Sequence, residues 1–248
     1  MRVLALDTAT ALTAVALQDV DEEANACLRD VVDLVAVDEP ALGARPNHAR
    51  RLLALIHEVL ELSGAGWAAV DRIAVGVGPG TFTGLRIGIA TAQALATSAG
   101  LPLAGVSTLQ SLALGAAHDR RAVLAVLDAR RGEAFMAGWS PEQDPLLDEP
   151  EWPPQVLSPE SLQRVAAQVA TQAASQVPAR AVPLALGDGA VRFRRQLEAA
   201  GVQVPPEDSS RHRVSARSHC RLAALARISA VPVEPEYLRA PDAERTSR

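Results

Sequence analysis

A short polar segment near the start of the chain, Asp7-Thr8-Ala9-Thr10, has residue types that can contact phosphate. A carboxylate and two hydroxyls in a turn can hold a phosphate group, but a glycine at the position of Ala9 would let the backbone approach more closely. A turn held by its own side-chain hydrogen bonds explains the same residues, and we favour that interpretation. Asp7, Thr8 and Thr10 remain candidates for a vestigial nucleotide contact.

Two glycine-rich turns could offer backbone amides to an anion. Gly78-Pro79-Gly80 lies between a predicted strand and a predicted helix, and Gly187-Asp188-Gly189 has a similar position later in the chain. The N-terminal end of a helix attracts anions, so Gly78, Gly80, Gly187 and Gly189 are further nucleotide candidates. We favour the alternative that each turn is only a tight connection. All 24 basic residues are arginine, so neither turn is a phosphate loop that ends in lysine.

The residues that could bind a metal or act as nucleophiles do not form a recognisable site. No two histidines are spaced at i and i+4, as a helical metal site needs; they are His48, His57, His118, His212 and His219. Cys27 and Cys220 are far apart and indicate idle thiols in a reducing compartment. We therefore predict no metal site, no catalytic residue and no intrinsic cofactor.

Hydrophobic patterns predict the elements that position these residues. Strands are expected over residues 3–6, 13–17, 31–37, 72–77, 103–106, 122–127, 133–139 and 182–186. Helices are expected over residues 46–63, 83–99, 108–117, 158–177, 190–200 and 215–229. Residues 140–159, rich in proline and acid, are expected to form an exposed excursion, and the last residues of the tail to be disordered.

This order of elements predicts an α/β fold of two lobes, each with a mixed sheet and flanking helices. We place the first lobe at residues 1–107, joined by a returning helix at 215–232, the second at 108–214, and a tail at 233–248. No apolar run is long enough to span a bilayer, and Asp7 interrupts the apolar start as it would not in a signal peptide. The expected location is the cytoplasm, with no membrane contact.

Two early helices have features of an interface. The apolar stripe of helix 46–63 is wider than one sheet requires, and helix 83–99 repeats small residues at Gly84, Gly88, Ala92 and Ala96. Packing within the lobe is the alternative, but we favour a partner surface. The candidate contact residues are Leu52, Leu55, Ile56, Val59, Leu60, Arg86, Ile89 and Gln93.

The charge distribution bears on nucleic acid binding. A net charge of -5 argues against unaided binding of RNA. Residues 189–227 nevertheless contain eight arginines against three carboxylates, so RNA contact is considered for Arg192, Arg194, Arg195, Arg211 and Arg213. A solvated arginine-rich face is the default interpretation, because no aromatic residues accompany the cluster.

Several motifs resemble one bacterial family. The segment from Gly76 to Ala92, GVGPGTFTGLRIGIATA, closely resembles the signature of the TsaB/YeaZ family. Further similar pieces are Leu6 to Thr10, the helix from His48 to Leu60, Pro102 to Leu109, Asp128 to Glu133, and Tyr237 to Arg239. The resemblance covers most of the chain and is weakest from Ser140 to Ala181.

The resemblance implies a two-lobed actin-like (ribonuclease H-like) fold and a non-catalytic role. The expected function is to activate a TsaD-type catalytic subunit, with a TsaE-type ATPase, in forming N6-threonylcarbamoyladenosine at position 37 of tRNAs that read codons beginning with A. ATP or ADP and tRNA would be bound only by the assembled complex. Alternatives are an autonomous ATP-using kinase, a metalloprotease, or a homodimer with its own interaction role; a homodimer is also expected for the isolated chain.

Overall fold

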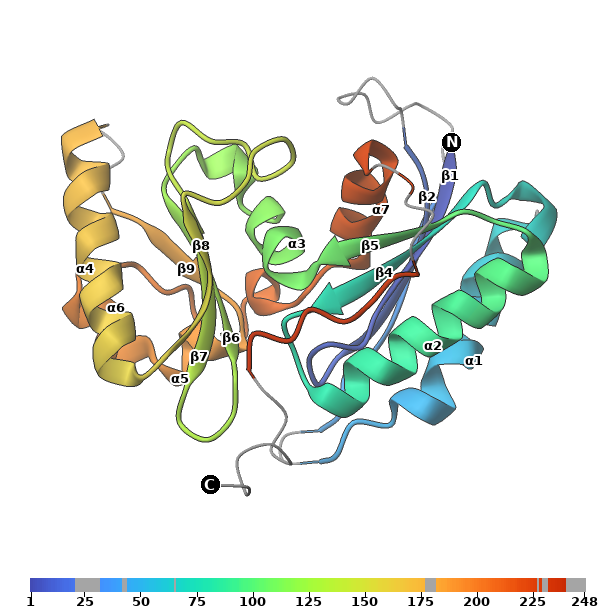
Figure 1. Ribbon diagram of the computed structural model, residues 1–248, viewed down its shortest axis with the longest axis horizontal. Helices are drawn as coiled ribbons and strands as arrows, with labels where there is room; N and C mark the ends of the chain where they lie inside the picture. Colours follow the sequence, from blue (N-terminus) through green and yellow to red (C-terminus); the bar gives the residue numbers. More distant parts are fainter. Residues whose placement is uncertain are drawn as a thin grey trace.

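The architecture consists of two β-sheets with helices outside and between them (Figure 1). The structure is a computed structural model that describes residues 1–20, 32–41, 44–64, 66–176, 182–226, 228 and 232–239. The predicted ends of the strand at 31 and of the helices at 177 and 229 lie outside the described residues, as do Cys27, Arg227 and the tail from residue 240.

The first sheet is mixed and has the strand order β3-β2-β1-β4-β5. β1 is antiparallel to β2, and β2 to β3, whereas β4 is parallel to its two neighbours, β1 and β5. Both sides of β1 are apolar, because Leu4 and Leu6 face one side and Val3 and Ala5 the other. The strands are β1 (Arg2–Asp7), β2 (Thr13–Asp19), β3 (Asp33–Asp38), β4 (Arg72–Gly78) and β5 (Leu103–Ser107).

Helices cover both faces of this sheet. α1 (His48–Ser63) and α2 (Phe82–Ala99) pack on the face formed by Leu4 and Leu6, and each ends at a glycine with a left-handed backbone. α7 (Ala216–Leu225) returns from the far end of the chain to cover the opposite face. The boundaries predicted for the lobes remain a prediction.

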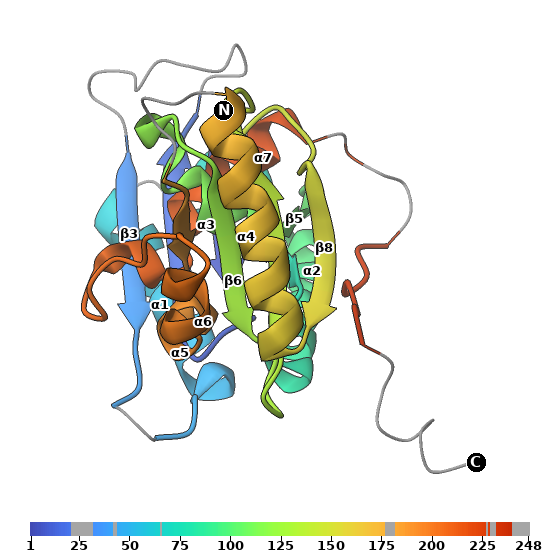
Figure 2. The same cartoon turned by 90° about the vertical axis from the view of Figure 1, so that its left-hand side faces the viewer.

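The second sheet repeats the pattern of the first four strands, with the order β8-β7-β6-β9. α4 packs on its outer face together with α5 and α6, and α3 packs on the face turned toward the first sheet (Figure 2). The strands are β6 (Val123–Asp128), β7 (Ala134–Trp139), β8 (Trp152–Leu157) and β9 (Leu184–Leu186). The helices are α3 (Thr108–Leu114), α4 (Pro159–Gln176), α5 (Asp188–Arg192) and α6 (Arg194–Ala199), with single turns η1 (Trp67–Ala69), η2 (Ala117–Asp119) and η4 (Ser210–His212).

The predicted α/β class is therefore confirmed, with two mixed sheets and flanking helices. Although Leu147 is 67% exposed, the prediction of an exposed excursion at 140–159 is wrong for part of this segment. Its second half forms strand β8, whose Pro153 and Pro154 are compatible with a strand at the sheet edge. Its first half packs Leu146 against the core of the first lobe. The helix predicted over 190–200 is interrupted at Phe193, which separates α5 from α6.

Candidate functional site

The polar turn after β1 packs directly onto the start of α2. The amide of Thr81 donates to the carbonyl oxygen of Ala9 at 2.7 Å, and the hydroxyl of Thr8 donates to the carbonyl oxygen of Gly84 at 2.7 Å. A side chain at Gly80 would place its Cβ 2.5 Å from the oxygen of Ala9. The glycine-rich turn and the polar turn are thus hydrogen-bonded to each other. The Thr81 amide at the start of α2 already donates to Ala9 and is not available to an anion.

This contact corrects the interpretation of the small residues on α2. Gly84 and Gly88 both face Thr8, and a Cβ at either position would overlap it. Ala92 and Ala96 are buried in the core of the same lobe. The groove therefore receives the end of β1, not a second helix, because small residues are needed wherever backbone approaches a helix closely.

The carboxylate of Asp7 is buried and is surrounded by partners from distant parts of the chain. One oxygen accepts from the amide of Ala9 at 2.9 Å, and the other accepts from the hydroxyl of Thr108 at 3.1 Å. Nε2 of His219, on α7, lies 3.1 Å from the second oxygen. Asp7 is 1% exposed and His219 is 0% exposed. The group expected to contact phosphate is thus enclosed by protein.

Both nitrogens of His219 face acceptors. Nδ1 lies 2.8 Å from the hydroxyl of Ser111 and 3.1 Å from the carbonyl oxygen of Ser215, while Nε2 faces Asp7. The Ser111 hydroxyl itself donates to the oxygen of Ser215 at 3.1 Å, so Nδ1 is the donor to Ser111. Nε2 lies close to the carboxylate of Asp7, although it forms no hydrogen bond of normal geometry with it.

Ser111, His219 and Asp7 have the residue types of a nucleophilic triad. Ser111 is fully buried, so no substrate can reach its hydroxyl in this conformation. The buried contacts of His219 with Asp7 and with Ser111 are instead a structural link between β1, α3 and α7. Sequence reasoning missed this link, because Asp7 and His219 are more than two hundred positions apart and no local pattern joins them.

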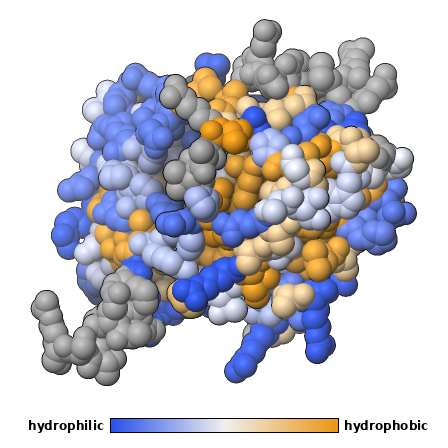
Figure 3. Space-filling view, turned by 45° about the vertical axis from the view of Figure 1, so that its right-hand side comes forward, coloured by the Kyte–Doolittle hydropathy of each residue, from blue (hydrophilic) through white to orange (hydrophobic). Residues whose placement is uncertain are grey.

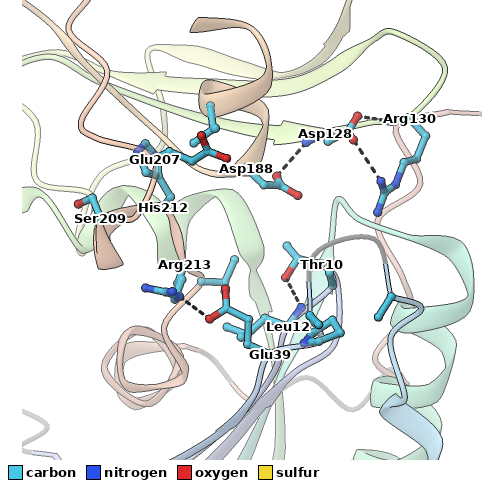
Figure 4. Close-up of a pocket in the computed structure, with 16 residues that line it drawn as sticks. Thr10, Leu12, Glu39, Asp128, Arg130, Asp188, Glu207, Ser209, His212 and Arg213 are labelled. Carbon is cyan, nitrogen blue, oxygen red and sulfur yellow. Dashed lines mark hydrogen bonds and ion pairs between the residues drawn. The ribbon is translucent and has the colours of Figure 1, made fainter.

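A pocket of about 510 Å³ lies between the lobes, beside the polar turn (Figure 4). Thr10 lines this pocket, whereas Asp7 and Thr8 do not. Gly187 and Gly189 lie behind it, where the absence of side chains lets them pack on the backbone of β6. The charged groups of the pocket are Glu39, Asp128, Arg130, Asp188, Glu207 and Arg213.

The charges of this pocket do not suit a polyphosphate. Four carboxylates face two guanidiniums, and the guanidinium of Arg213 already pairs with Glu39 at 2.9 Å. Asp128 is bound by Arg130 and by Arg192, and its amide donates to the carboxylate of Asp188 at 3.0 Å. A bound triphosphate would meet excess negative charge. The nucleotide candidates are therefore split between an enclosed turn and an acidic pocket.

The structure corrects the choice of interface residues on α1 and α2. All six apolar candidates are at most 5% exposed and belong to the core of the first lobe: Leu52, Leu55, Ile56, Val59, Leu60 and Ile89. The wide stripe is buried because α1 packs on the sheet and on α2 at once. Among the remaining candidates, Arg86 is exposed, and Gln93 donates to the carbonyl oxygen of Val233.

Other apolar side chains of these two helices are exposed. Leu53 and Leu62 of α1 are 57% and 67% exposed, and Phe82 at the start of α2 is 46% exposed. On the side of the molecule that carries α1 and α2, apolar patches alternate with polar ones (Figure 3). Leu53 and Leu62 are nine positions apart and therefore lie on opposite flanks of α1, so the exposed apolar side chains differ from those chosen from the stripe.

The arginines considered for RNA contact mostly have protein partners. Arg192 pairs with Asp128, Arg194 with Glu198, Arg211 with Asp119 and Arg213 with Glu39. Arg195 is exposed. The local positive charge counted along the sequence is therefore largely compensated by carboxylates from elsewhere in the fold. RNA contact by these residues stays a prediction.

Two kinds of feature are absent from the part of the chain that the structure describes. Within those residues, no helix combines the length and the apolar character that a membrane span requires. Within the same residues, no three histidine, cysteine or acidic side chains come together as metal ligands would.

Comparisons with known proteins agree with the motifs. The model of the family described as TsaD, tRNA N6-adenosine threonylcarbamoyltransferase, matches residues 40–142. The tRNA threonylcarbamoyladenosine biosynthesis protein TsaB of Escherichia coli K12 is 39% identical over 150 residues, which cover 58% of this chain and 57% of that protein. The match thus spans only a little over half of the relative's length.

Solved structures from Pseudomonas aeruginosa match over nearly the whole chain. One is an uncharacterized protein with similarity to peptidase YEAZ, with a TM-score of 0.71, 29% identity, and coverage of 96% of this chain and 99% of that one. The other is YeaZ, with a TM-score of 0.65, 28% identity, and coverage of 90% of each chain.

The two mixed sheets and their repeated strand order define a two-lobed α/β protein. The similarity in sequence and structure is more specific than the class. The chain is similar in sequence to TsaB of Escherichia coli and in structure to YeaZ of Pseudomonas aeruginosa.

Proposed function

We propose that this chain is a non-catalytic partner subunit of a TsaD-type catalytic subunit. The complex would form N6-threonylcarbamoyladenosine at position 37 of tRNAs that read codons beginning with A. The observation that supports the non-catalytic role is the enclosure of Asp7, whose carboxylate is held by Ala9, Thr108 and His219. A carboxylate with its oxygens occupied in this way is a poor ligand for a phosphate-bound metal ion.

In this proposal the partner performs the chemistry, which is transfer of the threonylcarbamoyl group from its adenylate to the tRNA adenosine. This chain stabilises the competent form of the partner in the cytoplasm, and a TsaE-type ATPase joins the assembly. Any ATP or ADP is held by the complex, because the interlobe pocket of this chain is dominated by carboxylates.

The docking face that we propose is the outer surface of α1 and α2. Leu53, Leu62 and Phe82 supply exposed apolar area there. Exposed apolar groups on adjacent helices are typical of a surface that a second subunit covers. In the isolated chain the same face would form a homodimer, which partner binding should dissociate.

Co-purification with the catalytic subunit tests this proposal. Leu62→Arg should abolish co-purification and leave the circular dichroism spectrum unchanged, because Leu62 is 67% exposed. Leu147→Arg is the matched control, since Leu147 is also 67% exposed but lies in the connection between β7 and β8, outside α1 and α2. Arginine at Ile56 or Leu60 would be uninformative, because both side chains are buried. Retained binding by Leu62→Arg would contradict the proposed face.

The enzyme alternatives have a separate test. Calorimetric titration of the isolated chain with ATP and Mg²⁺ should give no micromolar binding and no turnover. Micromolar binding with hydrolysis or phosphoryl transfer would refute the non-catalytic role. Protease assays on the isolated chain, with and without a metal chelator, address the metalloprotease alternative, and cleavage that the chelator abolishes would support it.

A further inference from the structure

The last described segment of the chain, residues 232–239, runs across both lobes and is called here the C-terminal strap (Figure 1). On the first lobe, the carbonyl oxygen of Val233 accepts from the side-chain amide of Gln93 at 2.8 Å. The amide of Glu236 donates to the carbonyl oxygen of Val77 at 2.7 Å. The strap is therefore fixed to α2 and to the end of β4.

The other end of the strap is attached to the second lobe. Leu238 packs against the core between α3 and the second sheet. A guanidinium nitrogen of Arg239 donates to the carbonyl oxygen of Ala129 at 3.1 Å, and the same side chain pairs with Glu133. Tyr237 lies between these attachments, so its position is set by contacts on both sides.

Tyr237 completes an exposed cluster at the start of α2. Its ring stacks on Phe82 with centroids 5.6 Å apart and an interplanar angle of 28°. Cζ of Arg86 lies 3.8 Å from the centre of the Phe82 ring, and its Nε donates to the Tyr237 hydroxyl at 3.1 Å. Phe82 and Tyr237 are 46% and 40% exposed, although aromatic residues make up only 3% of the chain.

The cluster holds a guanidinium in a fixed orientation with its terminal edge open. Nε is bound by Tyr237, and one face lies on Phe82. Among the described residues, no hydrogen bond or ion pair is found for the two terminal nitrogens of Arg86. A fork of N–H donors matches a carboxylate, and an ordered arginine loses little conformational freedom when it binds one.

We infer that the Phe82–Arg86–Tyr237 cluster is the anchor of the docking face and binds a carboxylate side chain of the partner protein. The inference rests on the proposed function and specifies its chemistry. Aromatic and arginine side chains carry much of the binding energy at protein interfaces, where the rings exclude water from the charged pair. The strap is the positioning element, because it delivers Tyr237 to α2 from the end of the chain.

A protein partner fits the cluster better than RNA does. Base stacking requires free ring faces along a basic groove, whereas these two rings stack on one another. The neighbouring carboxylates of Glu236 and Glu149 interact with each other, and this local negative charge opposes a polyanion. A single carboxylate that reaches the open edge of Arg86 avoids most of that repulsion.

Affinity measurements on the full chain with the TsaD-type subunit test the inference. Arg86→Glu should raise the Kd about 30-fold or more, since it places two carboxylates together at a central contact. Tyr237→Phe should raise the Kd several-fold, because it removes only the hydroxyl that orients Arg86. Arg164→Glu, on the exposed side of α4, is the control and should change the Kd less than twofold.

The outcomes separate the inference from the proposed function. If Arg86→Glu leaves the Kd unchanged while Leu62→Arg abolishes binding, the inference is wrong and the proposed function stands. Failure of the unmodified chain to bind the catalytic subunit would refute both. If Arg86→Glu leaves the Kd for the partner protein unchanged but weakens tRNA binding by the assembled complex, the cluster binds RNA, and the inference is again wrong.

Discussion

The pair formed by Asp7 and His219 allows a quantitative prediction about stability. His219→Ala removes the imidazole that faces the carboxylate at 3.1 Å and that contacts Ser111 on its other side. Both members of the pair are at most 1% exposed, so water cannot replace the lost partner without rearrangement. The variant should leave a buried carboxylate with fewer partners than it has now.

The structure sets the size of the effect. Breaking a buried pair by removing one member typically costs about 3–5 kcal/mol of unfolding free energy. The carboxylate of Asp7 keeps two hydrogen bonds, from Ala9 and Thr108, so we expect a loss near the lower end, about 3 kcal/mol. Adding Asp7→Asn removes the unpaired charge. The double variant should therefore lose about 1–3 kcal/mol less unfolding free energy than the two single variants lose when their losses are added.

Urea unfolding followed by circular dichroism measures these differences in unfolding free energy. The m-value, which is the slope of that free energy against urea concentration, should be the same for all variants if the same transition is compared. His57→Ala is the control for the substitution itself, because His57 is exposed on α1. A loss below about 1 kcal/mol for His219→Ala, or strictly additive effects in the cycle, would show that the two groups do not form an ion pair.

Three further predictions concern other parts of the fold. Gly84→Ala places a methyl group against Thr8 and should lower the unfolding free energy by about 1–3 kcal/mol or more, measured by urea unfolding. Burial, and then the carboxylate of Glu149, raise the pKa of Glu236, so the native state holds this proton more tightly and strap stability falls as pH rises through the raised pKa. Glu236→Gln should therefore slow hydrogen exchange in the strap at neutral pH, whereas the exposed Glu234→Gln should not. Burial also raises the pKa of the Cys220 thiol, so its alkylation should follow global unfolding; rapid alkylation of the native chain would contradict this.

The sequence was sufficient for the class of fold because its hydrophobic periods are clear. The short apolar runs of β1 and β2 and the helical pattern that ends at Gly64 are local signals, and the structure follows them closely. β8 was missed because Pro153 and Pro154 are signals against a strand, and only the position of β8 at a sheet edge makes them compatible.

The candidate site was less accessible to sequence reasoning. A stripe of apolar residues on α1 shows how much surface is apolar but not which neighbour covers it, so Ile56 and Leu60 were assigned to a partner although the lobe buries them itself. The small residues of α2 showed that something approaches closely, but the approaching group, Thr8, belongs to a turn more than seventy positions earlier. The contacts of Asp7 with Thr108 and His219 depend on the tertiary fold in the same way.

The return of α7 to the first sheet also has a consequence for synthesis on the ribosome. The thiol of Cys220 contacts the carbonyl oxygen of Val3, and α7 covers the face of β1 that carries Val3 and Ala5. Until translation has passed residue 225, that apolar face is without its native cover. The nascent first lobe must therefore wait for nearly the whole polypeptide to emerge, and chaperones have a long interval in which to bind it.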